Sequence, residues 1–353
     1  MQKIISEPEA GIKSPFISVL VTAYNRKEYI LEAVKSVLNQ TLERSKYEII
    51  VVKNYLDNNI DDFLSEYGAI NVYTDEIALG AKLAYGMEKA RGEVLCFLED
   101  DDMFLPNKLN EVYNIFHRNN KIILARNNIF KTLSPAMIKD SIKINSKNFN
   151  NIHEISISKI NSVKDLYYIF RKYTVFNTSS ISIRKDLYVK SSDLLKDVNY
   201  LIEPFLFFLG IFNGNNENIL IFQEQILSIY RMHNSWTQVS SDQSTDNFIR
   251  QNLMVSYQGI AAYEKFKTIF NTNLILKEFL IVSTNAWIVQ IKMVESKKIN
   301  FTELIALLKV GIWRRNVDIL LAVPLIFVSF FNRNYSSYVF KKALKKGQSF
   351  PAK

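Results

Sequence analysis

The 353-residue chain carries 44 Lys and Arg against 35 Asp and Glu, a net charge of +9, and 48% of its residues are hydrophobic. With 10 Gly and 7 Pro, long disordered tracts are not expected, and the length predicts two domains. The single cysteine, Cys96, excludes an internal disulfide and a Cys-rich metal site, and fits a buried thiol in an intracellular protein. Residues 1–15 lack the apolar region of a secretory signal, so export by that route is not expected.

Strand-like and helical segments alternate through the first half of the chain. Residues 16–23 (FISVLVTA) form a continuous apolar run, typical of a strand covered on both faces in a parallel sheet. Asn25 and Glu28 have the spacing of a helix capping box, and a helix is predicted from there through Gln40. The elements predicted next are strands at 48–53, 70–73, 94–98 and 121–126, and helices at about 80–91 and from Pro106 onward. This alternation predicts a doubly wound α/β layer, whose ligands bind outside the carboxyl ends of the strands.

The second half of the chain changes character from mixed to helical. Residues 134–162 are polar without a sustained period and predict loops around a short hairpin. The elements predicted after them are a strand at 178–185, a helix around 203–212, and a strand pair at 218–222 and 226–233. From about Ser244 only helical patterns follow, which predicts a C-terminal helical region.

An uncharged apolar stretch and a basic tail close the chain. Residues 319–331 (ILLAVPLIFVSFF) number 13 and would span about 20 Å as a helix, less than the roughly 30 Å core of a bilayer. The tail from Asn332 holds six Lys and Arg and no acid. The pair fits an interfacial helix on an anionic membrane, and equally a helix packed within the C-terminal region or at a homodimer interface.

Four consecutive acids, Glu99 to Asp102, directly follow the predicted strand at 94–98. Taken alone they fit a solvated turn that ends a strand. Adjacent carboxylates repel one another, however, and at the ligand-binding end of a strand a bound Mg²⁺ or Mn²⁺ explains them better. Such a cation is held by one or two carboxylates and by substrate phosphates, so a nucleotide diphosphate is the expected partner.

Four sequence blocks resemble those of family 2 glycosyltransferases of GT-A fold. The stretch 17–41 (ISVLVTAYNRKEYILEAVKSVLNQT) resembles the first strand and its T-x-Y-N-R type loop, and 78–106 (ALGAKLAYGMEKARGEVLCFLEDDDMFLP) resembles the helix that leads to the DXD strand. NTSSISIRKDLY and YRMHNSWT resemble the acceptor-side strand and the closing Y-R-x-H-x-x-S/T block. The resemblance covers about residues 16–238 and implies a mixed, mainly parallel sheet flanked by helices.

The resemblance implies an inverting transfer of a sugar from a nucleotide diphosphate, of UDP or GDP type, to a hydroxyl of a glycan or lipid-linked acceptor. It implies a divalent cation, Mg²⁺ or Mn²⁺, at Asp101, Asp102 and His233, and an acceptor contact at Trp236. Within the nucleotide loop, Tyr24 would stack on the base and Arg26 would lie near phosphate. The residues implied in nucleotide-sugar binding are Thr22, Ala23, Tyr24, Asn25, Arg26, Asn54, Lys82, Glu99, Asp100 and Arg231.

Three positions depart from the family pattern. Glu99 replaces the first aspartate of the DXD motif. The second predicted strand ends in Lys53 and Asn54 where the family usually carries an aspartate pair that contacts the base, which leaves Asn54 or Asp57 to substitute. The inverting reaction needs a carboxylate to take the proton of the incoming hydroxyl, and NYLIEPFLFFLG offers only Glu203 where the family has an E-D pair. Glu203 is the predicted base, and the competing interpretation is an acid favoured by the helix dipole.

Three other functions compete with glycosyl transfer. A dinucleotide-dependent oxidoreductase needs a G-x-G-x-x-G after its first strand, and TAYNRKEY contains none. A degenerate GT-A domain that binds nucleotide or glycan without catalysis is the main alternative. Nucleic-acid binding, suggested by the pI of 9.2, is not expected because the basic residues gather in the tail beside an apolar stretch.

These observations predict three parts of the chain. Residues 1–14 are an N-terminal extension, and 15–240 a GT-A domain with a nucleotide half at about 15–105 and an acceptor half at about 106–240. Residues 241–353 are a helical region with the apolar helix and the basic tail. The expected location is cytoplasmic, with peripheral contact to the inner face of the cell membrane.

Overall fold

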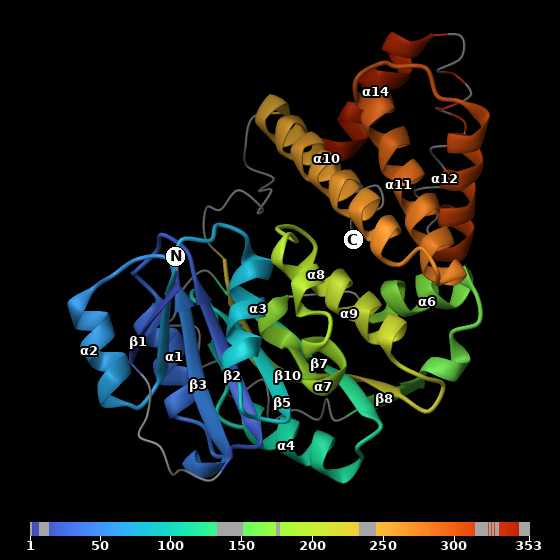
Figure 1. The fold of residues 1–353 in the computed structure, drawn as a ribbon. Coiled ribbons are helices and arrows are strands. Elements are labelled where there is room, and N and C mark those ends of the chain that lie inside the picture. The colour runs from blue at the N-terminus through green and yellow to red at the C-terminus, as the bar shows by residue number, and fades with distance from the viewer. Residues whose placement is uncertain are drawn as a thin grey trace. The chain divides into compact units, whose positions relative to one another are not determined.

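The chain divides into two compact units, drawn in Figure 1. The computed structural model describes residues 2–6, 14–132, 151–173, 177–232, 245–314, 324, 326, 328 and 332–345. Unit 1 comprises Met1–Lys159 and Val175–Met232, and unit 2 comprises Ile160–Thr174 and His233–Lys353. Helix α6 (Val163–Tyr173), which lies in the predicted acceptor half, is therefore grouped with the C-terminal helices. The assignment of nucleotide and acceptor halves stays a prediction.

Unit 1 is built on a ten-stranded mixed sheet in the order β1-β4-β3-β2-β5-β9-β7-β10-β6, and β8 pairs with β10. Strand β2 is parallel to β3 and β5, β3 is parallel to β4, and β7 is parallel to β10. Strand β9 is antiparallel to both of its neighbours, β5 and β7. The strands are β1 (Gln2–Ser6), β2 (Ile17–Ala23), β3 (Tyr47–Lys53), β4 (Ile70–Thr74), β5 (Val94–Glu99), β6 (Met103–Phe104), β7 (Ile122–Thr132), β8 (Ile152–Ser156), β9 (Ile181–Arg184) and β10 (Ile219–Arg231). The predicted α/β sheet, mixed and mainly parallel, is confirmed.

Helices cover both faces of this sheet, which explains the uninterrupted apolar runs of β2 and β3. On one face Val19 and Val51 pack in a core with α1, α2 and α4. On the other face α3 lies so close that a Cβ added to Gly86 would be 2.7 Å from the Leu20 side chain. The helices of unit 1 are α1 (Ile30–Leu38), α2 (Asn58–Glu66), α3 (Leu79–Lys89), α4 (Lys108–Arg118), α7 (Asp186–Val189), α8 (Ser192–Lys196) and α9 (Ile202–Asn213).

Two helix starts differ from their predicted positions. Asn25 does not cap α1, because its φ of +53° is left-handed and the helix begins at Ile30, with no side-chain cap bond at its N-cap residue. Helix α4 begins at Lys108, two residues after Pro106. The segment between β2 and α1 is thus a longer loop than a capping box would leave, and it lies where a ligand-binding loop is expected.

Two features of the sheet were also predicted differently. The strand pair expected at 218–222 and 226–233 is one strand, β10, whose pairing with β7 shifts register between Phe222 and Ile226. Strand β1, in the predicted N-terminal extension, adds to the sheet edge antiparallel to β4. Of the predicted loop and hairpin region at 134–162, residues 133–150 lie outside the described range.

The described part of unit 2 consists of helices around α11 (Leu274–Val294). This helix contacts α6, α10 (Thr245–Ile269), α12 (Phe301–Arg314) and α14 (Arg333–Lys345). Its Phe279 ring lies 4.6 Å from the ring centroid of Tyr167 on α6. At 21 residues α11 is long and apolar enough to cross a membrane, yet half of its apolar window is buried in the structure, as in the central helix of a folded domain. The predicted apolar helix at 319–331 lies, apart from three single residues, outside the described range.

Candidate functional site

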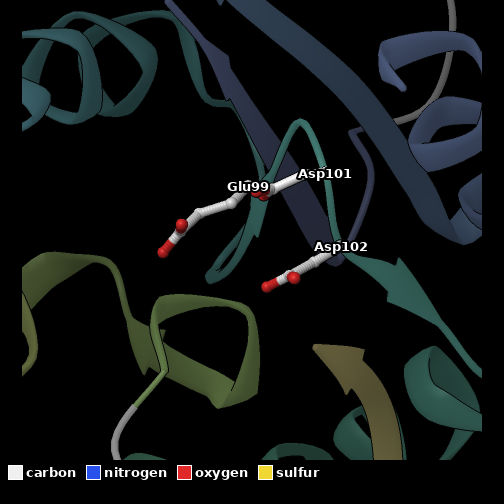
Figure 2. Close-up of side chains that lie close together, drawn as sticks. All are labelled: Glu99, Asp101 and Asp102. Atoms are coloured by element: carbon white, nitrogen blue, oxygen red, sulfur yellow. The ribbon is translucent and has the colours of Figure 1, made fainter. Parts of the chain in front are cut away.

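The four consecutive acids form the turn that follows β5, which we call the acidic turn. The turn is fixed to strand β2 because the Asp100 N–H donates to the Thr22 carbonyl at 3.2 Å. Carboxylate oxygens of Glu99, Asp101 and Asp102 lie within 4.8 Å of one another. Figure 2 shows that the side chains of Glu99 and Asp102 extend to the same side of the turn. Asp100 is ion-paired with the Arg26 guanidinium, which also lies 2.9 Å from Asp101 Oδ2.

Burial raises the pKa values of three carboxyl groups of the acidic turn. Burial, followed by repulsion from Asp101, raises the pKa of Asp102 to about 7. Burial raises the pKa of Asp100 to about 6, although Arg26 opposes the shift. Burial and the neighbouring charges of Asp102 and Asp101 raise the pKa of Glu99 well above its usual value. The three converging carboxylates of Glu99, Asp101 and Asp102 fit a hard divalent cation such as Mg²⁺ or Mn²⁺, which takes oxygen ligands.

A short 3-10 turn at Thr178–Ser180 supports the acidic turn from the neighbouring strand β9. Asp102 accepts hydrogen bonds from Asn177 Nδ2 at 2.9 Å and from Ser179 Oγ at 2.6 Å. The same Ser179 oxygen accepts from the Glu99 N–H at 3.0 Å. Their role in the site is not predictable from the sequence pattern, in which the polar N-T-S-S run at the start of the predicted strand is the one signal that points to them.

Arg231, at the end of β10, also contacts the acidic turn. Its Nε donates to the Asp101 carbonyl at 3.0 Å, and its N–H donates to Asp102 Oδ1 at 3.1 Å. The guanidinium is ion-paired with Glu32 and lies 4.3 Å from the ring centroid of Tyr29. Because Arg231 is only 6% exposed, these contacts make it a support of the turn, and its expected contact with phosphate stays a prediction.

A pocket of about 390 Å³ lies beside the acidic turn. Tyr24 is 43% exposed there, and the Lys82 ammonium lies 4.5 Å from its ring centroid. Burial lowers the pKa of Lys82 to about 8, and its Nζ donates to the Ile77 carbonyl at 2.8 Å. The residues that line the pocket are Thr22, Ala23, Tyr24, Arg26, Ile77, Leu79, Lys82, Glu99, Asp100 and Asn199. Seven of the predicted nucleotide-sugar residues therefore meet at one pocket.

Other predicted residues at the end of β3 do not line this pocket. The Asn25 N–H donates to Asn54 Oδ1 at 2.8 Å, and Asn54 Nδ2 donates back to Asn25 Oδ1 at 2.7 Å. Lys53 is fully buried and forms an ion pair of 2.7 Å with Asp61. Asp57 caps helix α2. The two side chains that stand where the family pattern has its aspartate pair are thus engaged within the fold, Lys53 with Asp61 and Asn54 with Asn25.

Glu203 lies in the first turn of α9 and faces the same support as the acidic turn. Its Oε1 accepts from Thr178 Oγ1 at 3.2 Å, next to Ser179 in the chain. Burial raises the pKa of Glu203, and its charge contributes to the raised pKa of Glu99. The structure therefore brings the predicted base near Glu99 and the turn that supports Asp102. His233 and Trp236 lie outside the described residues.

This arrangement of sheet, helices and acidic turn is that of a GT-A domain. The likeness is visible in S. aureus TarS residues 1–349, which superimposes with a TM-score of 0.50 at 15% identity and covers 95% of this chain and 93% of the other. Residues 18–178 match the family described as Glycosyl transferase family 2. This matched segment, which resembles that family, begins in β2 and ends in the turn that supports Asp102.

Curated relatives match over about a quarter to a third of this chain. An uncharacterized glycosyltransferase of Rickettsia typhi is 32% identical over 115 residues, which are 32% of this chain and 36% of the relative. The glycosyltransferase AglE of Haloferax volcanii is 31% identical over 93 residues, 25% of this chain and 31% of the relative. In the first eight relatives the chain spans between 18% and 40% of their length.

Proposed function

We propose that the protein transfers a sugar, with inversion, from a nucleotide-diphosphate sugar to an acceptor hydroxyl. The observation that carries the proposal is the convergence of Glu99, Asp101 and Asp102 within 4.8 Å, beside the pocket lined by the 22–26 loop and Lys82. The match of residues 18–178 to glycosyltransferase family 2 supports it. TarS, which shares the fold, was solved with UDP-GlcNAc and with UDP, so UDP is the first nucleotide to test, and GDP the second.

The donor would bind in the pocket of about 390 Å³. The exposed Tyr24 ring offers a surface on which a base can stack. Arg26 and Lys82 offer the positive charges for a diphosphate, and both already lie next to Asp100 in the free protein. Asn54 is hydrogen-bonded to Asn25, so another group of the pocket would recognise the edge of the base. Asn199, whose side-chain amide lines the pocket, is the proposed group.

A divalent cation, Mg²⁺ or Mn²⁺, would be held by Asp101 and Asp102, with Glu99 close enough to contribute. When bound, it supplies the charge that stabilises the departing diphosphate. Ser179 and Asn177 orient Asp102 through their hydrogen bonds to its carboxylate. Arg231 holds the backbone of Asp101 in place by donating to its carbonyl oxygen. His233 is proposed as a further contact of the cation or diphosphate.

The proton of the acceptor hydroxyl would go to Glu203. In this step the acceptor oxygen forms a bond to the anomeric carbon while the bond from that carbon to the diphosphate oxygen breaks. The raised pKa of Glu203 suits a base that must hold a proton after the attack. The hydrogen bond from Thr178 keeps its carboxylate near the acidic turn, and Trp236 is proposed to contact the acceptor.

The acceptor is proposed to be a glycan or a lipid-linked glycan at the cytoplasmic face of the cell membrane. The support for this is the uncharged stretch 319–331 followed by a tail that holds six Lys and Arg and no acid. A soluble catalytic domain with peripheral contact would meet a lipid-linked acceptor without spanning the bilayer. A homodimer through the C-terminal helices is the competing role for the same stretch.

The test is nucleotide release from a panel of UDP- and GDP-linked sugars in the presence of Mn²⁺, with excess chelator as the control. Release that one donor supports and the chelator abolishes is the expected result. Binding of UDP or GDP without release from any donor, with and without added glycan acceptors, would favour the degenerate, non-catalytic domain. Two observations support this second function. Lys53 and Asn54 replace the family's aspartate pair at the end of β3, and Glu203 is the single acid where the family has an E-D pair.

A further inference from the structure

We propose that the outward face of α14 is a docking surface for an anionic lipid bilayer. This rests on the proposed membrane-surface role and goes beyond it by naming the helix and the side chains that make the contact. The sequence itself singles out the apolar stretch 319–331 instead. Helix α14 has one buried and one outward face, a positive charge, and a place directly after that stretch.

Helix α14 is amphipathic, and only one of its faces is used inside unit 2. Ser336, Ser337 and Phe340 are buried, with at most 3% of their surface exposed. Ser337 Oγ donates to the Val294 carbonyl at the end of α11, at 2.9 Å. These contacts fix the rotation of the helix about its own axis, so the face that points outward is determined.

The outward face combines aromatic rings with basic groups. Tyr335 and Tyr338 are 57% and 62% exposed, and Lys342 is exposed one turn further on. The spacing i, i+3, i+7 places these three side chains in one line along the helix. Tyrosine rings are enriched at the boundary between water and lipid, and a lysine can extend its ammonium to lipid phosphates while its stem stays in apolar surroundings.

The charged side chains of α14 all have one sign. The helix contains Arg333, Lys341, Lys342 and Lys345 and no acid. Among the residues that the structure describes, no ion pair involves Arg333, Lys341 or Lys342. At the end of α11, where α14 packs, Glu295 is itself ion-paired with Lys297 at 2.7 Å. The face therefore presents net positive charge, which complements the negative surface of a cytoplasmic leaflet.

The position of α14 in the chain favours a bilayer over a nucleic acid as its partner. The helix begins directly after the uncharged stretch 319–331, and an apolar segment next to a basic, tyrosine-bearing helix suits the headgroup region of a membrane. A nucleic acid would use the charge but would leave the uncharged stretch without a role. Binding to nucleic acid is accordingly an outcome that the test must separate.

The test measures partitioning of the full chain onto vesicles of phosphatidylcholine with 30 mol% phosphatidylglycerol, against pure phosphatidylcholine vesicles. Wild-type protein should bind the anionic vesicles and not the neutral ones. The double variant Lys341→Gln with Lys342→Gln removes the exposed Lys342 and the half-buried Lys341 beside it. It should bind about 5- to 25-fold more weakly, because each basic residue near such a surface contributes roughly a fivefold factor. Tyr335→Ser with Tyr338→Ser should also weaken binding, and this loss should persist in 0.5 M NaCl.

The matched control is Lys164→Gln with Lys277→Gln, which removes two exposed lysines from α6 and α11 of the same unit. This control should bind within about twofold of wild type. Equal losses in both lysine pairs, no effect of either, or wild type that binds a single-stranded oligonucleotide but no vesicle would each overturn the proposal. Titration of UDP into the same proteins separates the two claims: unchanged UDP binding with lost vesicle binding concerns α14 alone, and lost UDP binding concerns the donor site.

Discussion

The acidic turn and helix α14 both concentrate charge of one sign, but they differ in how many of their charged side chains have bonding partners. In the acidic turn, Asp101 lies 2.9 Å from Arg26 and Asp102 accepts bonds from Ser179 and Asn177. On α14, the described residues include no ion pair for Lys341 or Lys342. In our proposals, cation binding at the acidic turn therefore depends on where individual oxygen atoms are held. Attraction of the α14 face to an anionic bilayer depends instead on how many positive charges it carries.

The largest expected effect of a single substitution is the loss of transfer rate in Glu203→Gln. Glu203→Gln keeps the size and the hydrogen-bonding oxygen of the side chain but removes the basic group, so the transfer rate should fall by about 10² to 10⁴-fold. The affinity for UDP should stay the same, because Glu203 is not among the residues that line the donor pocket. Steady-state transfer and calorimetry measure the two quantities.

The matched control for Glu203 is Glu217→Gln, which changes an exposed acid that is ion-paired with Lys121. It should leave the transfer rate within about twofold of wild type, because exposed ion pairs contribute little. Transfer by Glu203→Gln at the rate of this control would show that another group takes the proton.

A smaller effect is expected from Ser179, which holds the acidic turn without being a cation ligand. Ser179→Ala removes one bond to Asp102 and leaves the buried Glu99 N–H without its acceptor. Mn²⁺ affinity should fall about 10- to 100-fold, since partners that orient metal ligands contribute at that level. The control is Ser182→Ala on the adjacent strand, a fully buried serine whose hydroxyl faces Cys96 and no carboxylate.

Ser182→Ala should leave Mn²⁺ affinity unchanged, and both variants are checked by thermal unfolding. If the two serine variants lose affinity equally, burial in the strand, and not contact with Asp102, sets the cation affinity.

The pH dependence of stability gives a further contrast. The pKa of Asp102 is raised to about 7, so the folded state binds this proton more tightly than the unfolded state does. Without a cation, the contribution of Asp102 to stability should be fully present below pH 4 and lost as pH rises to about 7, at no more than about 1.4 kcal/mol per pH unit.

Added Mn²⁺ should reverse the sign of that pH effect, because the cation binds the deprotonated carboxylate. The shift of the melting temperature caused by Mn²⁺ should therefore grow between pH 5.5 and 7.5. Asp102→Asn removes the titrating group and should flatten this growth. A shift that is independent of pH in the wild type would separate Asp102 from cation binding.

The smallest effect is expected on the stability of the α14 variants. Lys341→Gln with Lys342→Gln should change the free energy of unfolding by less than about 0.5 kcal/mol, because surface substitutions without partners rarely do more. Denaturant unfolding measures it. A loss of several kcal/mol would mean that these lysines hold the fold, and the contrast between the two charged regions would then fail.

The sheet was largely predictable from sequence because its central strands are buried on both faces. Continuous apolar runs mark β2, β3 and β5, and the helices between them follow from their apolar spacing. Strand β1 was missed because a short edge strand, QKIIS, carries no such run. The polar residues at 223–225 resemble a turn, so the sequence predicts two strands there. In the structure they lie within the single strand β10, at a shift in its register against β7.

The candidate site was predictable only where its residues are contiguous in the chain. The acidic turn and the 22–26 loop are short stretches whose chemistry can be read from their order. Asn177 and Ser179 lie more than 70 residues from Asp102, and no local pattern announces that β9 pairs with β5 and brings them together. The roles expected of Asn54 and Arg231 illustrate the same limit, because their bonding partners come from other strands and loops.

The most direct test of the account is calorimetric titration of UDP into wild type and Asp101→Ala, each with and without Mn²⁺. Asp62→Ala, which removes an exposed acid on α2, is the control. The account predicts that wild type and the control bind UDP at least tenfold more tightly with Mn²⁺ than without it, and that Asp101→Ala loses this difference. UDP binding that is equal with and without Mn²⁺, or unchanged in Asp101→Ala, would contradict the assignment of the acidic turn as the cation and diphosphate site.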